Sequence, residues 1–177
     1  MKKLAVIFPG LGYGVDAPLL YYADFLFETK GYDRVHIDYR QYLQDTSLTL
    51  SERLASLRED ELAQLKNIPW SNYDVIFFLS KSIGTIEAGW IANQLHLPVK
   101  HIFLTPIAEA MPYCGPSTTV IMGTSDIHFA AYQQHCSIHN TPTRFFPGAD
   151  HSLEMNREPL RSIEILKDYL TFLESLL

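Results

Sequence analysis

The chain has 177 residues, of which 47% are hydrophobic, and its formal net charge at pH 7 is −6. This length suits a single domain with a substantial core, which we expect to span residues 1–177. An acidic chain without a cluster of Lys or Arg is a poor candidate for binding nucleic acid, and no apolar run approaches the roughly 20 residues that cross a membrane.

Short apolar runs alternate with helical patterns along the whole chain. We expect strands at 4–8, 34–39, 73–79, 100–104, 118–122 and 143–146. Helices are expected at 19–29, 49–67, 83–95, 127–135 and 159–176, the second opened by the capping box Thr49-x-x-Glu52. The alternation predicts a doubly wound α/β fold, with a mostly parallel six-stranded sheet and helices on both faces. In such a sheet the ligand site lies beyond the carboxyl ends of the strands.

The last two helices carry patterns that fix further expectations. Asn140 and Pro142 suggest that the first of them ends before His139. The final helix opens at Pro159, which suits a first helical turn. Its apolar positions predict one buried stripe, made of Ile163, Leu166, Leu170, Leu173 and Leu177.

Two features bear on the compartment in which the protein works. The apolar run at 4–8 is shorter than the roughly 7 residues of a signal-peptide core, and no cleavage site follows it, so we interpret it as a strand. Two cysteines, Cys114 and Cys136, are too few for a disulfide framework in a chain of this size. Both observations favour a cytoplasmic protein.

The most informative stretch is the junction of the strand at 73–79 with the helix that follows. The turn Ser80-Lys-Ser82-Ile-Gly84 leaves no linker between the two elements. Small residues two before and two after the apex are needed there, because the backbones crowd. Ser82 stands at the apex, where the N-terminus of the helix offers unpaired N–H groups to a developing negative charge.

This small-x-Ser-x-Gly pattern resembles the nucleophile elbow of the α/β-hydrolase superfamily, with Ser80 in place of the first Gly. Two later loops resemble the acid and histidine loops of the superfamily in the same chain order: Gly123-Thr-Ser-Asp126 after the fifth strand, and Gly148-Ala-Asp-His151-Ser after the sixth. The resemblance covers nearly the whole chain. It is closest to small serine hydrolases without a cap, of the dienelactone hydrolase and carboxylesterase-like branch.

The resemblance implies roles for three residues. Ser82 would be the nucleophile, His151 the general base and then acid, and Asp126 the carboxylate that orients the imidazole. Asp150 is the rival acid, but we prefer Asp126, because a residue adjacent to His151 in the chain should point away from the imidazole. Alternatively, His151 would be a loop histidine on the surface and Asp126 a turn residue or helix cap.

The backbone N–H groups of Leu11 and Ile83 would form the oxyanion hole. The superfamily often has His-Gly-x-Gly in the loop after the first strand, whereas this chain has Pro9-Gly10-Leu11-Gly12, which keeps the glycines but lacks the histidine. Lys81 would point either to solvent or over the pocket mouth, and in the second position it would lower the pKa of His151.

A small, open substrate site is expected because the segment after the fourth strand is too rich in Pro and Gly for a long cap helix. The side chains that we expect to flank it are Tyr13, Met111 and Tyr113. Such a site suits a short or surface-presented acyl group. Ordinary core packing is the alternative for these three side chains.

Three other functions would each fit one part of the sequence. Gly10-x-Gly12-x-Gly14 followed by Asp38 approaches a dinucleotide fingerprint, but Val15 stands where the third Gly belongs. A metal site would need His128, His135, His139 and Cys136, which we interpret as ordinary side chains because no carboxylate joins them. A binding or interaction protein that keeps the fold without catalysis is the third alternative.

The sequence therefore predicts a serine hydrolase that cleaves a small ester or related acyl bond through an acyl-Ser82 intermediate. We expect no cofactor, no metal, and no nucleic-acid or membrane partner. The expected partner is a small-molecule acyl substrate, and a neighbouring subunit in a homo-oligomer could complete the open site.

Overall fold

The structure is a computed structural model that describes residues 1–38 and 47–177. Within these residues the chain forms a six-stranded sheet in which every neighbouring pair of strands is parallel. The spatial order is β2-β1-β3-β4-β5-β6, and the strands are β1 (Lys3–Phe8), β2 (Asp33–His36), β3 (Val75–Lys81), β4 (Lys100–Leu104), β5 (Thr118–Gly123) and β6 (Thr143–Phe146). The predicted sheet is confirmed, and it is wholly parallel. The strand expected at 34–39 ends at His36, and Tyr39 lies outside the described residues.

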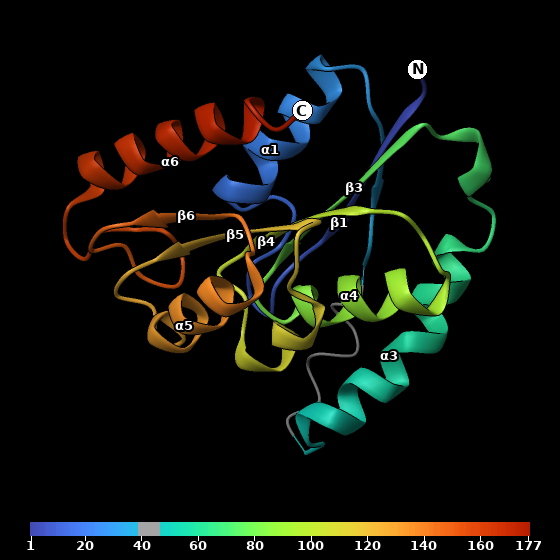
Figure 1. The fold of residues 1–177 in the computed structure, drawn as a ribbon, viewed down its shortest axis with the longest axis horizontal. Coiled ribbons are helices and arrows are strands. Elements are labelled where there is room, and N and C mark those ends of the chain that lie inside the picture. The colour runs from blue at the N-terminus through green and yellow to red at the C-terminus, as the bar shows by residue number, and fades with distance from the viewer. Residues whose placement is uncertain (39–46) are drawn as a thin grey trace.

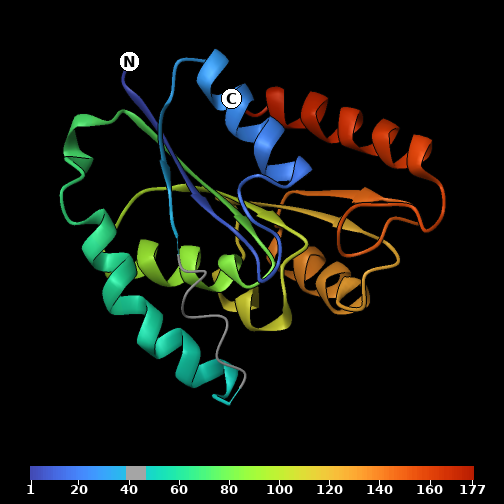
Figure 2. The same cartoon turned by 180° about the vertical axis from the view of Figure 1, so that it is seen from behind.

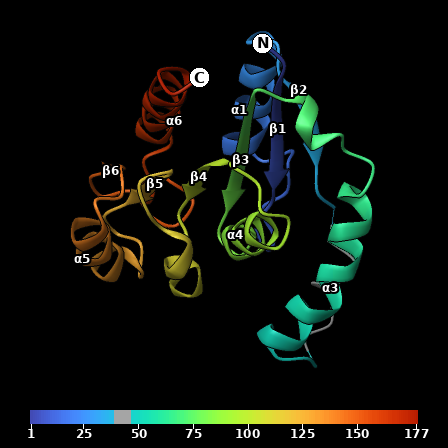
Figure 3. The same ribbon diagram turned by 45° about the vertical axis from the view of Figure 1, so that its right-hand side comes forward.

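Helices cover both faces of the sheet (Figure 1). On one face lie α1 (Pro18–Thr29) and α6 (Pro159–Glu174), and on the other lie α4 (Gly84–Gln94) and α5 (Phe129–His139), with α3 (Leu50–Leu65) against α4. The view from behind and the oblique view show the same two layers (Figures 2 and 3). Two short 3₁₀ helices, η1 (Trp70–Asn72) and η2 (Ala108–Tyr113), complete the elements of the described chain, in which no helix is long and apolar enough to cross a membrane.

Each face of the sheet has its own core, because successive side chains of a strand point to opposite faces. In β1, Val6 and Phe8 belong to the core beneath α4, whereas Ala5 and Ile7 belong to the core beneath α1 and α6. All four are buried. The continuous apolar runs of the sequence are therefore strands covered on both sides, as the parallel arrangement requires.

The buried face of α6 differs from the predicted stripe. Ile165, Tyr169 and Leu173, four residues apart, are the buried positions of this helix. Ile163 is 60% exposed, so its predicted burial is wrong. Two positions along a helix correspond to a rotation of about 200°, so Ile163 and Ile165 cannot both face the sheet.

The predicted end of α5 is also wrong, because this helix continues to His139. Asn140 follows it in a left-handed conformation with φ 51°, and its N–H donates to the carbonyl of Cys136. Asn tolerates this conformation and often closes a helix in this way. The residue that suggested an early end therefore caps the last turn.

Both edges of the sheet are short strands of four residues that carry an arginine. On β2, Arg34 forms ion pairs with Asp24 and Glu28 of α1. On β6, the Arg144 guanidinium lies 5.3 Å from the centre of the Phe146 ring. The edges are thus occupied by charged side chains that are held in place.

His101 of β4 is a titratable residue in the core, and it is only 7% exposed. Its ring centre lies 5.8 Å from that of Phe78 and 5.1 Å from that of Phe103. The Nδ1 atom has no hydrogen-bond partner in the part of the chain that the structure describes. Burial lowers the pKa of His101 to about 4, because the charged form would lose its hydration.

We expect this histidine to make the protein less stable in acid. The unfolded chain takes up a proton at about pH 6.5, whereas folded His101 does so only at about pH 4, so the free energy of unfolding falls as the pH drops through this window. The contribution is on the order of 3 kcal/mol. Urea unfolding from pH 7 to pH 4 should show a shallower decline for His101→Leu than for wild type. The control variant is His96→Asn, because His96 is exposed and Asn tolerates its left-handed backbone; this variant should keep the wild-type slope, and equal slopes in all three proteins would contradict the prediction.

Candidate active site

Ser82 lies in the turn between β3 and α4 with a left-handed backbone, at φ 54°. A non-glycine residue adopts this conformation at a cost and keeps it only where its surroundings enforce it. Here the Ser82 N–H donates to the Leu104 carbonyl at 3.0 Å, and the Thr85 N–H donates to the Ser82 carbonyl at 3.0 Å. Because β3 ends at Lys81 and α4 begins at Gly84, the predicted linker-free turn is present.

The His151 imidazole lies between Ser82 and Asp126. Its Nε2 is 2.9 Å from Ser82 Oγ, and its Nδ1 is 2.6 Å from Asp126 Oδ2. A carboxylate can only accept, so Nδ1–H donates to Asp126, and Nε2 of the neutral ring is left to accept the Ser82 hydroxyl proton. The structure thus brings together the three side chains that the resemblance singled out.

Asp126 is held as an anion. Burial raises the pKa of its carboxyl group, but hydrogen bonds from the His151 ring and from the His128 N–H, with the charges of both rings, outweigh burial and leave the pKa below the usual range. The His128 N–H donates to Asp126 Oδ1 at 2.9 Å while Oδ2 faces His151. Both carboxylate oxygens therefore accept a hydrogen bond, and the carboxylate that contacts the imidazole is held in one orientation.

Asp150 has a different position. Its Oδ1 accepts from the Ser152 N–H at 2.8 Å and from the Glu154 N–H at 3.0 Å. These bonds close the loop 147–154 on itself. Asp126, rather than Asp150, is the carboxylate in contact with the imidazole of His151.

The loop after β1 lies directly against the nucleophile turn. A Cβ placed on Gly10 would be 3.4 Å from Ser82 Cβ, which leaves little room for any larger residue. Gly10 and Tyr13 close a tight turn with reciprocal backbone hydrogen bonds, and Leu11 lies inside it. Within the described chain, neither the Leu11 nor the Ile83 N–H donates a hydrogen bond. Both N–H groups are therefore free to stabilise an oxyanion, and the oxyanion hole itself stays a prediction.

Lys81 differs from both of its predicted positions. It points neither to solvent nor over a pocket mouth, because it is 1% exposed. Its Nζ donates to the backbone carbonyl of His151 at 2.8 Å and lies 5.0 Å from the centre of the Tyr13 ring. Burial lowers the pKa of Lys81 to about 8, although the carboxylates of Asp126 and Asp150 act in the opposite direction. Strand periodicity could not reveal this, because β3 is buried on both faces.

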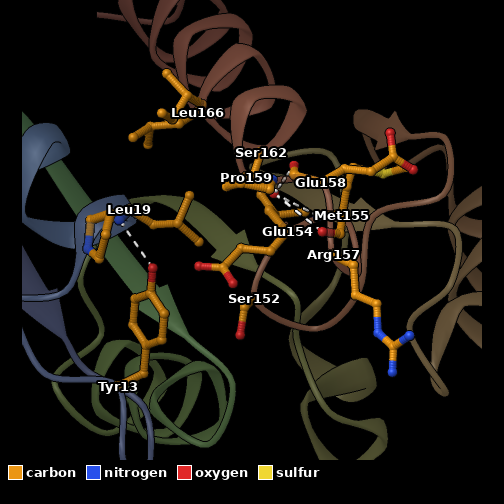
Figure 4. Close-up of a pocket in the computed structure, with 13 residues that line it drawn as sticks. Tyr13, Leu19, Ser152, Glu154, Met155, Arg157, Glu158, Pro159, Ser162 and Leu166 are labelled. Carbon is orange, nitrogen blue, oxygen red and sulfur yellow. Dashed lines mark hydrogen bonds between the residues drawn. The ribbon is translucent and has the colours of Figure 1, made fainter.

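A cavity of about 380 Å³ lies beside the histidine loop (Figure 4). Its walls come from Tyr13, the first turn of α1, residues 152–155 and the first turns of α6. The Tyr13 hydroxyl accepts from the Leu19 N–H at 3.1 Å, and the Glu154 carboxylate points across the cavity toward this pair. Tyr13 is one of the three predicted pocket residues, and its place in a substrate site stays a prediction; Leu19 and Glu154 were not predicted, because no local motif marks them.

The other two predicted pocket residues do not line this cavity. Met111 packs against the core beneath α4. Tyr113 lies on α4, where a Cβ on Gly89 would overlap its ring. The physical reason is that η2 folds back onto α4 after β4, so the alternative of core packing describes both residues better.

The histidines that suggested a metal site are divided between two places. The rings of His135 and His139 are 4.3 Å apart on α5, whereas the His128 ring lies 6.2 Å from that of His151. Among residues 1–38 and 47–177, no group of three or more His, Cys, Asp or Glu side chains could hold a metal ion. Cys114 and Cys136 are both free thiols.

Searches by sequence found no matching family model and no matching curated protein. Comparison with solved structures found several similar folds. An alpha-beta serine hydrolase homologue from Coxiella burnetii has a TM-score of 0.65 at 14% identity, over 96% of this chain and 84% of its own. A dienelactone hydrolase from Anabaena variabilis has 0.60 at 18%, over 94% and 82%. The alpha/beta hydrolase domain-containing protein 10 from mouse has 0.62 at 11%, over 98% and 90%.

These similarities confirm the predicted α/β-hydrolase fold. The aligned regions span 96% and 98% of this chain in the first and third of these comparisons. Identities of 11–18% establish a common architecture only. The chemistry therefore has to be argued from the side chains of this chain.

Gly123 allows a test of how the site is assembled. It ends β5, and a Cβ there would overlap the backbone carbonyl of Ala149 in the histidine loop. We expect Gly123→Ala to displace this loop, to cost about 1–3 kcal/mol of stability, and to slow any reaction of Ser82. The control is Gly115→Ala, since a Cβ on Gly115 meets nothing within 4 Å. Urea unfolding and labelling by a fluorophosphonate probe measure both effects, and matching results for the two variants would contradict the prediction.

Proposed function

We propose that this chain, which has the α/β-hydrolase fold, is a serine hydrolase that cleaves a small ester or related acyl bond. The observation that carries the proposal is the pair of hydrogen bonds made by His151, at 2.9 Å to Ser82 Oγ and 2.6 Å to Asp126 Oδ2. A hydroxyl, an imidazole and a buried carboxylate in this order are what activation of a serine nucleophile requires.

Acylation begins when His151 Nε2 takes the proton of the Ser82 hydroxyl as Oγ attacks the carbonyl carbon of the substrate. The carbonyl oxygen becomes an oxyanion, which the Leu11 and Ile83 N–H groups would stabilise. When the tetrahedral intermediate collapses, the bond to the leaving alcohol breaks, and His151 gives its proton to the departing oxygen. The acid and Ser82 are now joined as an ester.

Deacylation repeats the sequence with water. His151 Nε2 takes a proton from water, the hydroxide attacks the acyl carbon, and collapse returns the proton to Ser82 Oγ. Throughout, Asp126 stabilises the imidazolium and holds the ring with Nδ1–H toward the carboxylate. The low pKa of Asp126 supports this role, because the carboxyl group stays ionised at the pH where an imidazole acts as base.

A cavity whose lining begins one residue after His151 supports a small substrate, although none of Ser82, Asp126 and His151 lines it. Its volume of about 380 Å³ is near the lower end for small-molecule sites. Apolar walls from Leu19 and Met155 favour an apolar group, and Glu154 adds a polar end. This suits the short acyl compounds expected from the absence of a long cap helix in the described chain.

A fluorophosphonate probe and p-nitrophenyl acetate test the proposal directly. Wild type should be labelled and should hydrolyse the ester, whereas Ser82→Ala should do neither. Asp126→Asn should lower turnover by a factor on the order of 10⁴, because an amide favours the wrong imidazole tautomer. Ser117→Ala, at the opposite end of β5, serves as the control and should resemble wild type. Absence of both labelling and hydrolysis in folded wild type would refute the proposal and favour a binding protein without catalysis.

A further inference from the structure

Lys81 is a buried cation whose contacts belong to the candidate site. Its ammonium group donates to the His151 carbonyl at 2.8 Å, the single hydrogen-bond partner recorded for it within the described residues. Its stem passes Gly10, where an added Cβ would lie 3.3 Å from Lys81 Cγ. The Tyr13 ring lies 5.0 Å from Nζ. One side chain therefore contacts the loops that follow β1 and β6 while it is anchored on β3.

The histidine loop needs an anchor at this point. Its base is tied to the neighbouring β5 loop, where the Ser125 N–H donates to the Ala149 carbonyl at 2.9 Å. Its tip has to reach past β5 and β4 to the end of β3. There the backbone of His151 is held by Lys81, while its ring is held by Ser82 and Asp126. The Asp150 bonds shape the loop internally, and the Lys81 contact ties the main chain of His151 to the end of β3.

Burial of an ammonium group is costly, so its presence calls for a reason. The groups that face it are Asp126, Asp150, the Tyr13 ring and the His151 carbonyl. The two carboxylates offset part of the cost through space, but no side chain forms an ion pair with Lys81 within the described chain. A methionine of similar length would fill the same space without a charge. The charge therefore serves the contact with His151 rather than the packing.

We propose that Lys81 is a positioning residue whose charged hydrogen bond fixes the backbone of His151, so that the imidazole stays between Asp126 and Ser82. This role rests on the proposed hydrolase function of the same site. A hydrogen bond from an ammonium group is roughly twice as strong as one from a neutral donor. The position of the imidazole should therefore depend on the charge of Lys81.

The direction of the pH effect follows from the burial of the amine. Lys81 is charged below pH about 8 and loses its proton as the pH rises through that value. The hold on His151 should then weaken, and reaction at Ser82 should slow on the alkaline side. Tyr13 does not explain such a change, because burial raises the pKa of its hydroxyl above the usual value of 10.0.

The test follows labelling of Ser82 by a fluorophosphonate probe from pH 6 to pH 10 in wild type, Lys81→Met and Lys100→Met. We expect the wild-type rate to fall above pH 8. Lys81→Met should react about tenfold more slowly at pH 7, since small displacements of a catalytic group carry costs of this order or larger, and its alkaline decline should be absent. Lys100 is the matched control, because it is an exposed lysine that also lies over an aromatic ring, 5.4 Å from the centre of Phe77.

A second measurement does not depend on activity. Proton NMR detects the far-downfield resonance of the His151 Nδ1–H that faces Asp126. This resonance should be present in wild type at pH 7, broaden above pH 8, and be weak or missing in Lys81→Met. Thermal unfolding checks that each variant is folded. If Lys81→Met does not fold, the wild-type pH dependence of the resonance and of labelling decides the proposal.

Different results separate the two proposals. Labelling of Lys81→Met within twofold of wild type, or an unchanged alkaline decline in that variant, would overturn the role of Lys81 and leave the hydrolase proposal intact. If wild type is not labelled at any pH, the hydrolase proposal fails. The NMR resonance then still decides whether Lys81 positions His151, and a resonance unaffected by pH and by Lys81→Met would overturn it.

Discussion

The hydrogen bond between Ser82 and His151 joins the ends of two strands that are not neighbours. β3 and β6 are separated in the sheet by β4 and β5, so the contact requires the carboxyl ends of all four strands to lie at the same end of the sheet. A wholly parallel sheet provides this, because all strands run in the same direction. Each crossover connection returns the chain to the end of the sheet where the strands begin. The two-sided core, the helical layers and the short loops are the conditions under which such a sheet is stable. The site thus depends on the architecture as a whole, although only three side chains form its centre.

Charge is distributed around this hydrogen bond in an asymmetric way. The buried carboxylate of Asp126 receives donors on both oxygens, while the buried ammonium of Lys81 has the backbone of His151 as its recorded acceptor. Both charged groups are buried, and in the protein interior electrostatic interactions are only weakly screened. The His151 imidazole is partly exposed, at 40% for its side chain. In the proposed function the two buried charges would therefore lie on the inner side of the site, and the partly exposed imidazole that acts as base would lie on the outer side.

The sequence predicted the order and type of nearly all the described elements because their signals are local. The strand at 100–104 and the strand at 143–146 were placed with the bounds that the structure has, and the capping box at Thr49 is present.

The wrong predictions concern contacts that local sequence patterns do not contain. The exposure of Ile163 depends on which side of α6 meets the sheet, and Tyr113 follows η2 onto α4 rather than toward the cavity. The burial of Lys81 depends on loops that lie some 70 residues away in either direction along the chain, since its partners are Gly10 and His151. The three residues of the candidate triad could be found because the resemblance supplied their long-range relation.

The two edges of the sheet have a consequence for how this protein meets other chains. Exposed strand edges are templates for intermolecular pairing, and a parallel sheet has one at each side. Here each edge strand is only four residues long, and Arg34 and Arg144 place charged side chains along them. Arg34 is held by Asp24 and Glu28 of α1 at one side, and Arg144 lies over the Phe146 ring at the other. Edge-to-edge growth of the sheet, the route by which many β-rich proteins aggregate, is therefore disfavoured at both sides by short edge strands that carry charge.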